Sequence, residues 1–474
     1  MSTGPRRALA AAAALSAAAA LWSSTTLEPA PGARPATQAV AAAAPLASPR
    51  ETGAGDDGIT AAARETMLRQ QPLLAAAAAI RPAAERAAAA GFAGIALEGP
   101  NLALYWKGGV PAAVRAAVDG ARKSAPVVVK PAEHSRDELR AAADRVFAAG
   151  RSRGVTAVKY AADGSGLQVV TDAAKPVPAL PATGVRVETV RQPVPRPVGK
   201  PAAKPAATAR KAAVKAALAS PFWTEPSRDD DVAPWWGGAH IIDAQGRYNN
   251  FGYWLEEGYH CTSGFAVRFE DEVRMLAPAH CSSADHVTTD GGGTQMNSIV
   301  AIAPDRFQNH PHDLLLLDAP NAEGYVYDGP QGSHRGKPVV GWGHMEVGET
   351  LCISGGQTGV LCDFKVSAWS VTRAIWTTDS DGDGTGNIKD LIEVTTPTQI
   401  RNLYARSDSP EMRNAISQGD DGSPMFTLSG AGVLAKGILI TSEALAGNFT
   451  GRAYVQSFAT AVTDFPGLEP VTAP

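Results

Sequence analysis

A proline-rich stretch divides this chain of 474 residues into two parts of different composition. From Gln192 to Ala219 the sequence reads QPVPRPVGKPAAKPAATARKAAVKAALA. Because proline removes backbone donors and favours extended chain, we expect a semi-rigid, basic linker here and place it at residues 192–232. The part before the linker is rich in alanine, whereas seven of the nine tryptophans lie beyond residue 220. The hydrophobic content, 45%, is enough for two or three domains with their own cores.

The N-terminus has the pattern of a secretory signal. Arg6 and Arg7 precede an apolar run from Ala8 to Trp22, which is shorter than the about 20 residues needed to span a bilayer. We place the signal peptide at residues 1–39 and a disordered segment at residues 40–57. An alanine-rich disordered tail is the alternative, but it leaves the order of charge and apolar run unexplained. We therefore expect a secreted protein with no membrane span once the signal is removed.

Residues 58–191 have the pattern of a small α/β (α+β) domain. Apolar runs flank Gly99–Asn101 and Asp163–Gly164, which predicts two hairpins. The run Val127–Val129 predicts a buried strand. Ser135–Glu138 forms a capping box, in which the serine and glutamate side chains each satisfy a free backbone N–H at the start of a helix. No motif in this domain carries chemistry.

Residues 233–465 have an all-β texture, followed by a tail at residues 466–474. Short apolar runs alternate here with turns rich in Gly, Pro, Asp and Asn, which predicts a β-sandwich or a pair of β-barrels. The runs are Gly264–Phe269, Ile299–Ile302, Leu314–Leu317, Val339–Trp342, Ile392–Thr396 and Gly437–Thr441.

The chain has four cysteines: Cys261, Cys281, Cys352 and Cys362. An even number in an exported chain predicts two disulfides. A zinc site is the alternative, but no C-x-x-C spacing favours it.

Three local patterns follow one another in the second part of the chain. The segment LAPAHC ends at His280 and Cys281, HDLLLL begins at His312, and GDDGSP runs from Gly419 to Pro424. In this order the chain resembles the chymotrypsin-like (trypsin-like) serine proteases, and most closely their bacterial streptogrisin and α-lytic branch. The resemblance covers residues 233–465, and the N-terminal domain loosely resembles the pro-regions of such proteases.

The resemblance implies an all-β double-barrel fold for the C-terminal domain. His280 would be the general base and Asp313 its orienting carboxylate. The backbone N–H groups of Gly419 and Asp421 would form the oxyanion hole. Ser442 and Glu443 would line the substrate cleft.

The resemblance also implies the disulfide pairing, Cys261 with Cys281 and Cys352 with Cys362. In the streptogrisin type, the acidic residue at the position of Asp420 pairs with an arginine directly after the first cysteine of the second loop. Here that place holds Ile353, so either another cation pairs with Asp420 or the loop geometry differs.

Asp421 stands where the family has its serine nucleophile. A carboxylate is a poor acyl-transfer nucleophile, and it places negative charge where the substrate oxyanion should develop. We expect it to pair with protonated His280 and to accept hydrogen bonds from the N–H groups of the oxyanion hole. Ser423 offers a hydroxyl two residues later, but a small residue packed under a tight loop explains it better.

Residues 379–390 have the ligand spacing of an EF-hand-type calcium loop. The five oxygen-bearing positions are Asp379, Asp381, Asp383, Asn387 and Asp390. The alternative is an acidic, glycine-rich hairpin between Thr372–Thr377 and Leu391–Thr396. Both interpretations stay open at this point.

Together these features predict a secreted protease homologue that is inactive or severely impaired, a pseudoprotease that binds a peptide or protein and requires no cofactor. One alternative is an active serine endopeptidase that uses a displaced hydroxyl such as Ser423. Another is a calcium-stabilised, non-enzymatic binding module. A net charge of −4 does not favour a nucleic-acid partner. The sequence does not predict the oligomeric state.

Overall fold

The computed structural model describes residues 51–52, 57–192, 227–228, 231, 233–244, 260–281, 287–290, 299–300, 308–309, 311–376, 385–395, 416, 419–442 and 451–473. The predicted signal peptide, most of the predicted linker, Glu443 and the first three calcium-loop residues lie outside this range. Among the described helices, none is long and apolar enough to cross a membrane.

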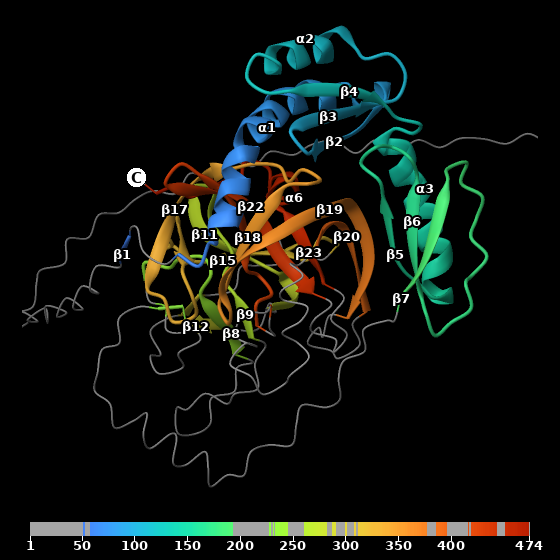
Figure 1. Ribbon diagram of the computed structural model, residues 1–474. Helices are drawn as coiled ribbons and strands as arrows, with labels where there is room; N and C mark the ends of the chain where they lie inside the picture. The colour runs from blue at the N-terminus through green and yellow to red at the C-terminus, as the bar shows by residue number, and fades with distance from the viewer. Residues whose placement is uncertain are drawn as a thin grey trace, which may run out of the picture. The chain divides into compact units, whose positions relative to one another are not determined.

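The N-terminal part contains both helices and strands (Figure 1). Its β2, β3 and β4 form one sheet, whereas β5, β6 and β7 join a larger sheet. The elements are α1 (Ala61–Arg86), β2 (Phe92–Glu98), β3 (Asn101–Trp106), α2 (Ala112–Ala121), β4 (Val127–Pro131), α3 (Arg136–Gly150), β5 (Val155–Tyr160), β6 (Leu167–Asp172) and β7 (Val187–Gln192), preceded by a two-residue strand, β1 (Glu51–Thr52).

Several local predictions for this part are confirmed. Glu98 pairs with Asn101 across the predicted first turn, and β5 pairs antiparallel with β6. Ser135 and Glu138 form the capping box that starts α3. The prediction of a buried strand at Val127–Val129 is wrong in its burial. Because β4 is an edge strand paired only with β3, its side chains are half-buried or exposed after Val127.

Helix α1 was not predicted from the sequence. Thr60 caps it by accepting a hydrogen bond from the Ala63 N–H, and two prolines, Pro72 and Pro82, lie inside it. Proline removes a helical hydrogen bond, so a helix that continues through two of them needs support from packing. The alanine-rich composition hides the apolar stripe that would have indicated this helix.

The C-terminal part is rich in β-structure, as predicted. Its strands are β8 (His240–Ala244), β9 (His260–Thr262), β10 (Ala266–Phe269), β11 (Glu272–Ala277), β12 (Val287–Asp290), β13 (Ile299–Val300), β14 (Gln308–Asn309), β15 (Leu314–Asp318), β16 (Tyr325–Asp328), β17 (Arg335–Trp342), β18 (Thr350–Gly355), β19 (Gly359–Trp376), β20 (Thr385–Thr395), β21 (Pro424–Ser429), β22 (Gly432–Ser442), β23 (Arg452–Ser457) and β24 (Glu469–Pro470), with helix α6 (Phe458–Asp464) before β24. One sheet has the order β14-β15-β11-β10-β24 and a second has the order β13-β12-β8-β9, whereas β16 to β23 share one large sheet. The double-barrel arrangement stays a prediction.

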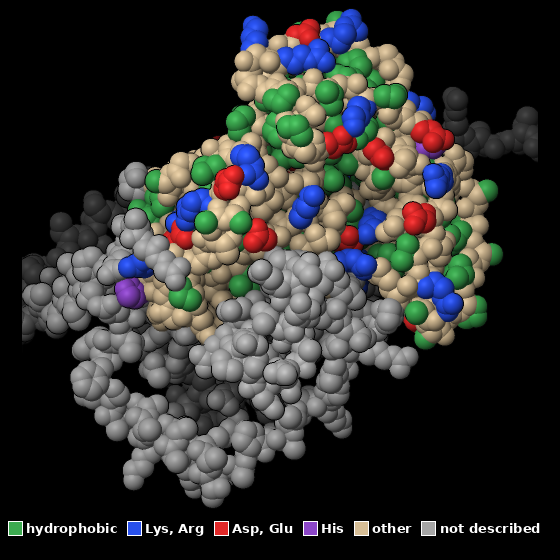
Figure 2. Space-filling view, in the orientation of Figure 1, with side chains coloured by type: hydrophobic (Ala, Val, Ile, Leu, Met, Phe, Trp, Pro, Cys, Tyr) green, Lys and Arg blue, Asp and Glu red, His purple; other side chains and the backbone are tan. Residues whose placement is uncertain are grey.

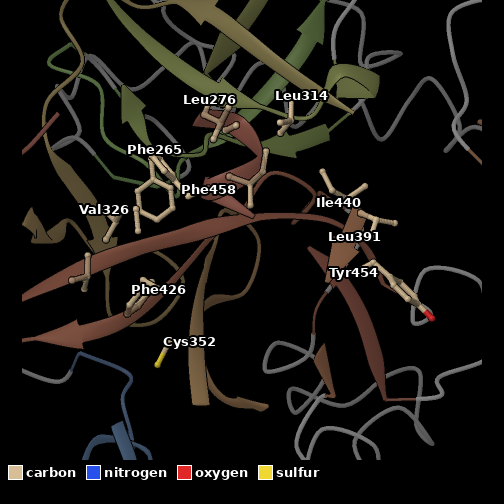
Figure 3. Packing of buried hydrophobic residues seen from close by; sticks show 14 of the residues in the cluster. Phe265, Leu276, Leu314, Val326, Cys352, Leu391, Phe426, Ile440, Tyr454 and Phe458 are labelled. Carbon is tan, nitrogen blue, oxygen red and sulfur yellow. The ribbon is translucent and has the colours of Figure 1, made fainter. Parts of the chain in front are cut away.

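One hydrophobic cluster anchors the strands that carry the candidate site (Figure 3). Phe265 packs against Phe458 with 6.0 Å between the ring centroids. The same cluster includes Leu276 of β11, Leu314 of β15 and Phe426 of β21. Strand β11 ends shortly before His280, β15 begins directly after Asp313, and β21 begins shortly after Asp421. The shared core therefore holds these three parts of the chain together.

The N-terminal and C-terminal parts share packing and strand pairing. Met67 of α1 lies in the same buried cluster as Cys352, and Ile80 lies in the same cluster as Phe364. Strand β5 pairs antiparallel with β19, with Trp369 opposite Tyr160. The N-terminal part is therefore joined to the β-rich part by contacts as well as by the linker.

Positive and negative side chains are interspersed over the described part of the face in Figure 2.

Candidate active site

His280 is held by Asp313 through two hydrogen bonds. The chain leaves β11, turns at Pro278 and places His280 in a single 3-10 turn, while Asp313 stands directly before β15. The backbone N–H of His280 donates to Asp313 Oδ1 at 2.9 Å, and the ring Nδ1 lies 2.6 Å from Asp313 Oδ2. Asp313 is buried and has a φ of 57°, a left-handed conformation that aspartate tolerates better than most residues. The carboxylate thus fixes the orientation of the imidazole and leaves Nε2 for other partners.

Both predicted disulfides are confirmed. Cys261 bonds to Cys281, directly after His280, and Cys352 bonds to Cys362 across β18 and β19. The first bond ties the turn that carries the histidine to β9.

The segment that carries Asp421 is attached to β9 and β22. The Thr262 N–H donates to the Asp421 carbonyl at 2.7 Å, and the Thr262 hydroxyl donates to the Gly419 carbonyl at 2.7 Å. The Gly422 N–H donates to the Leu439 carbonyl at 2.7 Å. Gly422 has a φ of 99°, and a Cβ there would lie 2.0 Å from the Thr262 carbonyl oxygen, so only glycine fits.

Asp421 faces His280 from this segment. Its Oδ2 lies 3.6 Å from His280 Nε2, and the two side chains are 16% and 15% exposed. Burial alone would lower the pKa of His280, but the charge of Asp313, its hydrogen bond and then Asp421 raise it to about 10. Burial raises the pKa of the Asp421 carboxyl, and His280 offsets part of that rise. At neutral pH the imidazole therefore carries a proton.

Asp421 Oδ1 is buried and has no hydrogen-bond partner among the described residues. In the described part of the chain, the N–H groups of Gly419 and Asp421 also donate no hydrogen bond. The prediction that these N–H groups bond to the Asp421 carboxylate is therefore wrong. Because the carboxylate faces the imidazole instead, the two donors predicted to form the oxyanion hole are left without an acceptor.

Asp420, the residue before, is fully buried and turned toward a different loop. Its Oδ1 accepts from the Gln357 N–H at 3.0 Å, and its Oδ2 accepts from the Thr358 hydroxyl at 2.9 Å. A Cβ on Gly355 would lie 2.4 Å from Asp420 Oδ1. The loop between Cys352 and Cys362 thus supplies a backbone donor and a hydroxyl to this carboxylate.

Ser423 is fully buried. Its hydroxyl and its N–H both donate to the Asp420 carbonyl, at 2.5 and 2.9 Å. This hydroxyl is engaged in a local turn under the loop, as expected for a small structural residue.

Ser442 ends β22 and pairs with Ala453 of β23. Its hydroxyl is buried and finds no hydrogen-bond partner within the part of the chain that the structure describes. Of the two residues predicted to line the cleft, Ser442 is described and Glu443 lies outside the described residues.

The segment predicted as a calcium loop lies at the end of the β19–β20 hairpin. Trp376 pairs with Thr385, so β19 and β20 form a hairpin, but its second strand begins at Thr385 and not at Leu391 as expected. Asn387 and Asp390 lie on β20, and Asp390 Oδ2 lies 2.5 Å from Arg140 Nη2 and 3.3 Å from His312 Nε2. Asp379, Asp381 and Asp383 lie outside the described residues. Calcium binding stays a prediction, and one of its five ligands already pairs with a cation.

Two buried ionic residues near the candidate active site were not predicted from the sequence. Arg228 is fully buried although it lies within the predicted linker, and Asp231 beside it is 2% exposed. No periodicity or motif marks either residue. Only the structure shows that Arg228 and Asp231 are buried in the β-rich part.

No protein-family model matches this chain, and no curated protein matches it. Comparison with solved structures finds similarity to protease A of Thermobifida fusca, with 19% identity and a TM-score of 0.31 over 50% of this chain and 98% of that one. A Nocardiopsis protease matches with 16% identity and a TM-score of 0.33 over 50% and 98%. A Cellulomonas bogoriensis chymotrypsin matches with 19% identity and a TM-score of 0.30 over 45% and 91%. These proteins are of the bacterial chymotrypsin-like class that the sequence motifs resemble, and at such TM-scores the similarity assigns no activity.

Proposed function

We propose that this chain is a secreted homologue of chymotrypsin-like serine endopeptidases that binds a peptide or protein ligand and does not cleave it. The proposal depends above all on the 3.6 Å separation between His280 Nε2 and Asp421 Oδ2. In a serine protease the place beside the imidazole belongs to the hydroxyl that attacks the peptide carbonyl. Here a carboxylate lies at that place.

Three chemical reasons make peptide hydrolysis ineffective. A protonated His280 has no lone pair to accept a proton, so it does not act as a general base near neutral pH. Attack by Asp421 would give a labile anhydride rather than a stable acyl-enzyme. Its negative charge also opposes the oxyanion that the two free N–H groups would stabilise. In a serine protease of another fold, loss of the nucleophile alone costs about 10⁶-fold in rate.

Unpaired polar groups favour a site that still binds a ligand. The N–H groups of Gly419 and Asp421 are donors without acceptors in the described part of the chain, and the Ser442 hydroxyl is buried without a partner. A buried polar group without a partner costs about 1–3 kcal/mol. A ligand that supplied carbonyl and N–H groups would recover part of that cost.

One edge of β22 is suited to an extended peptide. Strand β21 pairs with β22 as far as Ile438, and Gly422 and Ser423 bond to Leu439, while β23 continues on the other side to Ser442. Among the described residues, the last residues of β22 therefore have no paired strand on the β21 side. A peptide added there as a further strand would lie beside the Asp421 segment.

Secretion rests on the predicted signal peptide at residues 1–39, and the two disulfides agree with an oxidising compartment. Self-cleavage of the linker would require a nucleophile, so we expect the N-terminal domain to remain attached. Fractionation of an expressing culture checks both points. A full-length intracellular chain, or spontaneous release of the N-terminal domain in a pure preparation, would contradict them.

The proposed function is tested with the full-length protein, a set of extended peptides and a fluorophosphonate probe that labels activated serines. We expect calorimetry to detect peptide binding, mass spectrometry to find the peptides intact, and the probe to leave the protein unlabelled. Labelling at the rate of an intact serine protease would overturn the proposal.

A further inference from the structure

Arg228 is a fully buried cation that precedes the first strand of the β-rich part in the sequence. Its guanidinium donates through Nη1 to the Ser354 hydroxyl at 2.5 Å and to the Gly355 carbonyl at 3.3 Å, and through Nη2 to the Gly329 carbonyl at 3.1 Å. It also lies 5.6 Å from the centre of the Tyr327 ring. Because a buried charge is costly unless it is satisfied, a side chain held this way has a defined place in the fold.

The backbone at Arg228 is hydrogen-bonded as well as its side chain. The His240 N–H donates to the Arg228 carbonyl at 2.7 Å. Three residues later, Asp231 accepts from the Tyr327 hydroxyl at 2.7 Å and from the Trp236 N–H at 3.2 Å. Arg228 and Asp231 therefore form part of the body of the β-rich region.

The acceptors Ser354 and Gly355 end β18, where the chain enters the turn of residues 356–358. That turn holds the Asp421 segment by two routes. The Gly356 N–H donates to the Thr262 hydroxyl at 3.0 Å, and that hydroxyl donates to the Gly419 carbonyl. The next two residues of the turn donate directly to the Asp420 carboxylate.

Close packing leaves little room for these groups to shift. A Cβ on Gly238 would lie 2.3 Å from the Ser354 hydroxyl and 3.1 Å from Arg228 Nη1. A Cβ on Gly355 would lie 2.4 Å from Asp420 Oδ1 and 2.5 Å from the Thr358 hydroxyl. Densely packed groups transmit displacement, so a shift of Ser354 and Gly355 would reach Asp420.

We infer that Arg228 is a positioning residue, which fixes the turn of residues 354–358 and thereby places the segment of residues 419–422 so that Asp421 faces His280. The position of Asp421 then depends on three distant stretches of chain, Arg228, residues 354–358 and residues 419–422, and the first of them lies upstream of His280, Asp313 and Asp421. A cut after Arg228 would release this anchor, so the part of the chain that keeps the site intact begins no later than Arg228. This inference concerns the geometry of the site and does not depend on whether the site cleaves or only binds.

The test uses the full-length chain with isotope-labelled histidines and compares Arg228→Met with the native protein and with Asp421→Asn. Asp421 is one of the two carboxylates that raise the pKa of His280. If the segment moves in Arg228→Met, the pKa of His280 should fall by at least half of the fall seen in Asp421→Asn. Adding Arg228→Met to Asp421→Asn should lower the pKa of His280 little further.

His312 is the internal control, because its pKa depends on Asp390 and Asp464, which Arg228 does not contact in any hydrogen bond described above. Its titration should be the same in the native protein and in Arg228→Met. An unchanged pKa of His280 in folded Arg228→Met would overturn the inference, as would equal shifts of both histidines. If Arg228→Met does not fold, Arg228→Lys and Ser354→Ala are used, and each should lower the pKa of His280 alone by a smaller amount. A native pKa of His280 in both of these variants would equally overturn the inference.

Discussion

Asp421 Oδ2 lies 3.6 Å from His280 Nε2, on the side of the imidazole opposite the Asp313 hydrogen bond. The imidazole thus stands between two carboxylates, and its proton is stabilised by both. A serine in the place of Asp421 would leave the same imidazole with one carboxylate and a lower pKa. Under the proposed function, this one side chain would therefore change both the nucleophile and the protonation state of the base.

The first prediction concerns the pKa of His280. Asp421→Asn removes one carboxylate from the imidazole, so the pKa of His280 should fall from about 10. Since the pKa in the native fold lies above the ordinary value near 6.5, the stability contributed by this histidine is fully present below pH 6.5 and is lost as pH rises through 10. Histidine titration by NMR checks the shift. An unchanged pKa would mean that the carboxylate does not face the ring.

A second prediction concerns the ion pair between Arg81 of α1 and Glu346, whose side chains are 5% and 2% exposed. Burial raises the pKa of Glu346 against the opposing charge of Arg81. Arg81→Met should lower the free energy of unfolding by about 3–5 kcal/mol, because it leaves Glu346 buried without this partner. Adding Glu346→Gln should restore part of the loss. Urea unfolding measures both.

The matched control is the exposed pair of Arg69 and Glu65 on the same helix, with exposures of 62% and 72%. Arg69→Met should cost about 0–1 kcal/mol. Equal costs for the two arginine variants would contradict the buried interface between α1 and the β-rich part.

A third prediction concerns His312, which lies between Asp464 of α6 and Asp390 of β20, at 2.8 and 3.3 Å. Burial would lower its pKa, but the two aspartates raise it to about 9. The stability from this contact is fully present below pH 6.5 and is lost as pH rises through 9. Thermal melting at pH 6 and pH 9.5 should therefore differ more in the native protein than in Asp464→Asn. Identical differences would rule out the contact.

A fourth prediction separates the displaced-hydroxyl alternative from the proposed function. The Ser423 hydroxyl donates to the Asp420 carbonyl, so Ser423→Ala should cost about 1 kcal/mol of stability. It should leave peptide binding and any residual hydrolysis unchanged. Loss of hydrolysis in this variant, with its fold intact, would identify Ser423 as a nucleophile.

Local patterns predicted much of the site and part of the fold. The histidine, its aspartate, the Asp421 segment and both disulfides each follow from short motifs in a recognisable order, and the hairpins follow from turn residues. The partners of Asp420 could not be predicted, since they are a backbone N–H and a hydroxyl more than sixty positions away. Arg228 and α1 were missed for a similar reason. Their roles come from packing against distant strands, and neither a proline-rich composition nor a run of alanines reveals such contacts.

The most direct measurement is hydrolysis of a peptide ester by full-length Asp421→Ser, with Asp421→Asn as the control of similar size that lacks a nucleophile. Asp421→Ser restores the hydroxyl and removes the charge that helps to keep His280 protonated. If the rest of the site is in place, it should hydrolyse the ester at least about 10²-fold faster than the native protein and react with the fluorophosphonate at the new serine. Asp421→Asn should do neither. If Asp421→Ser folds and stays as inactive as Asp421→Asn, the claim that this one side chain accounts for the loss of cleavage is contradicted.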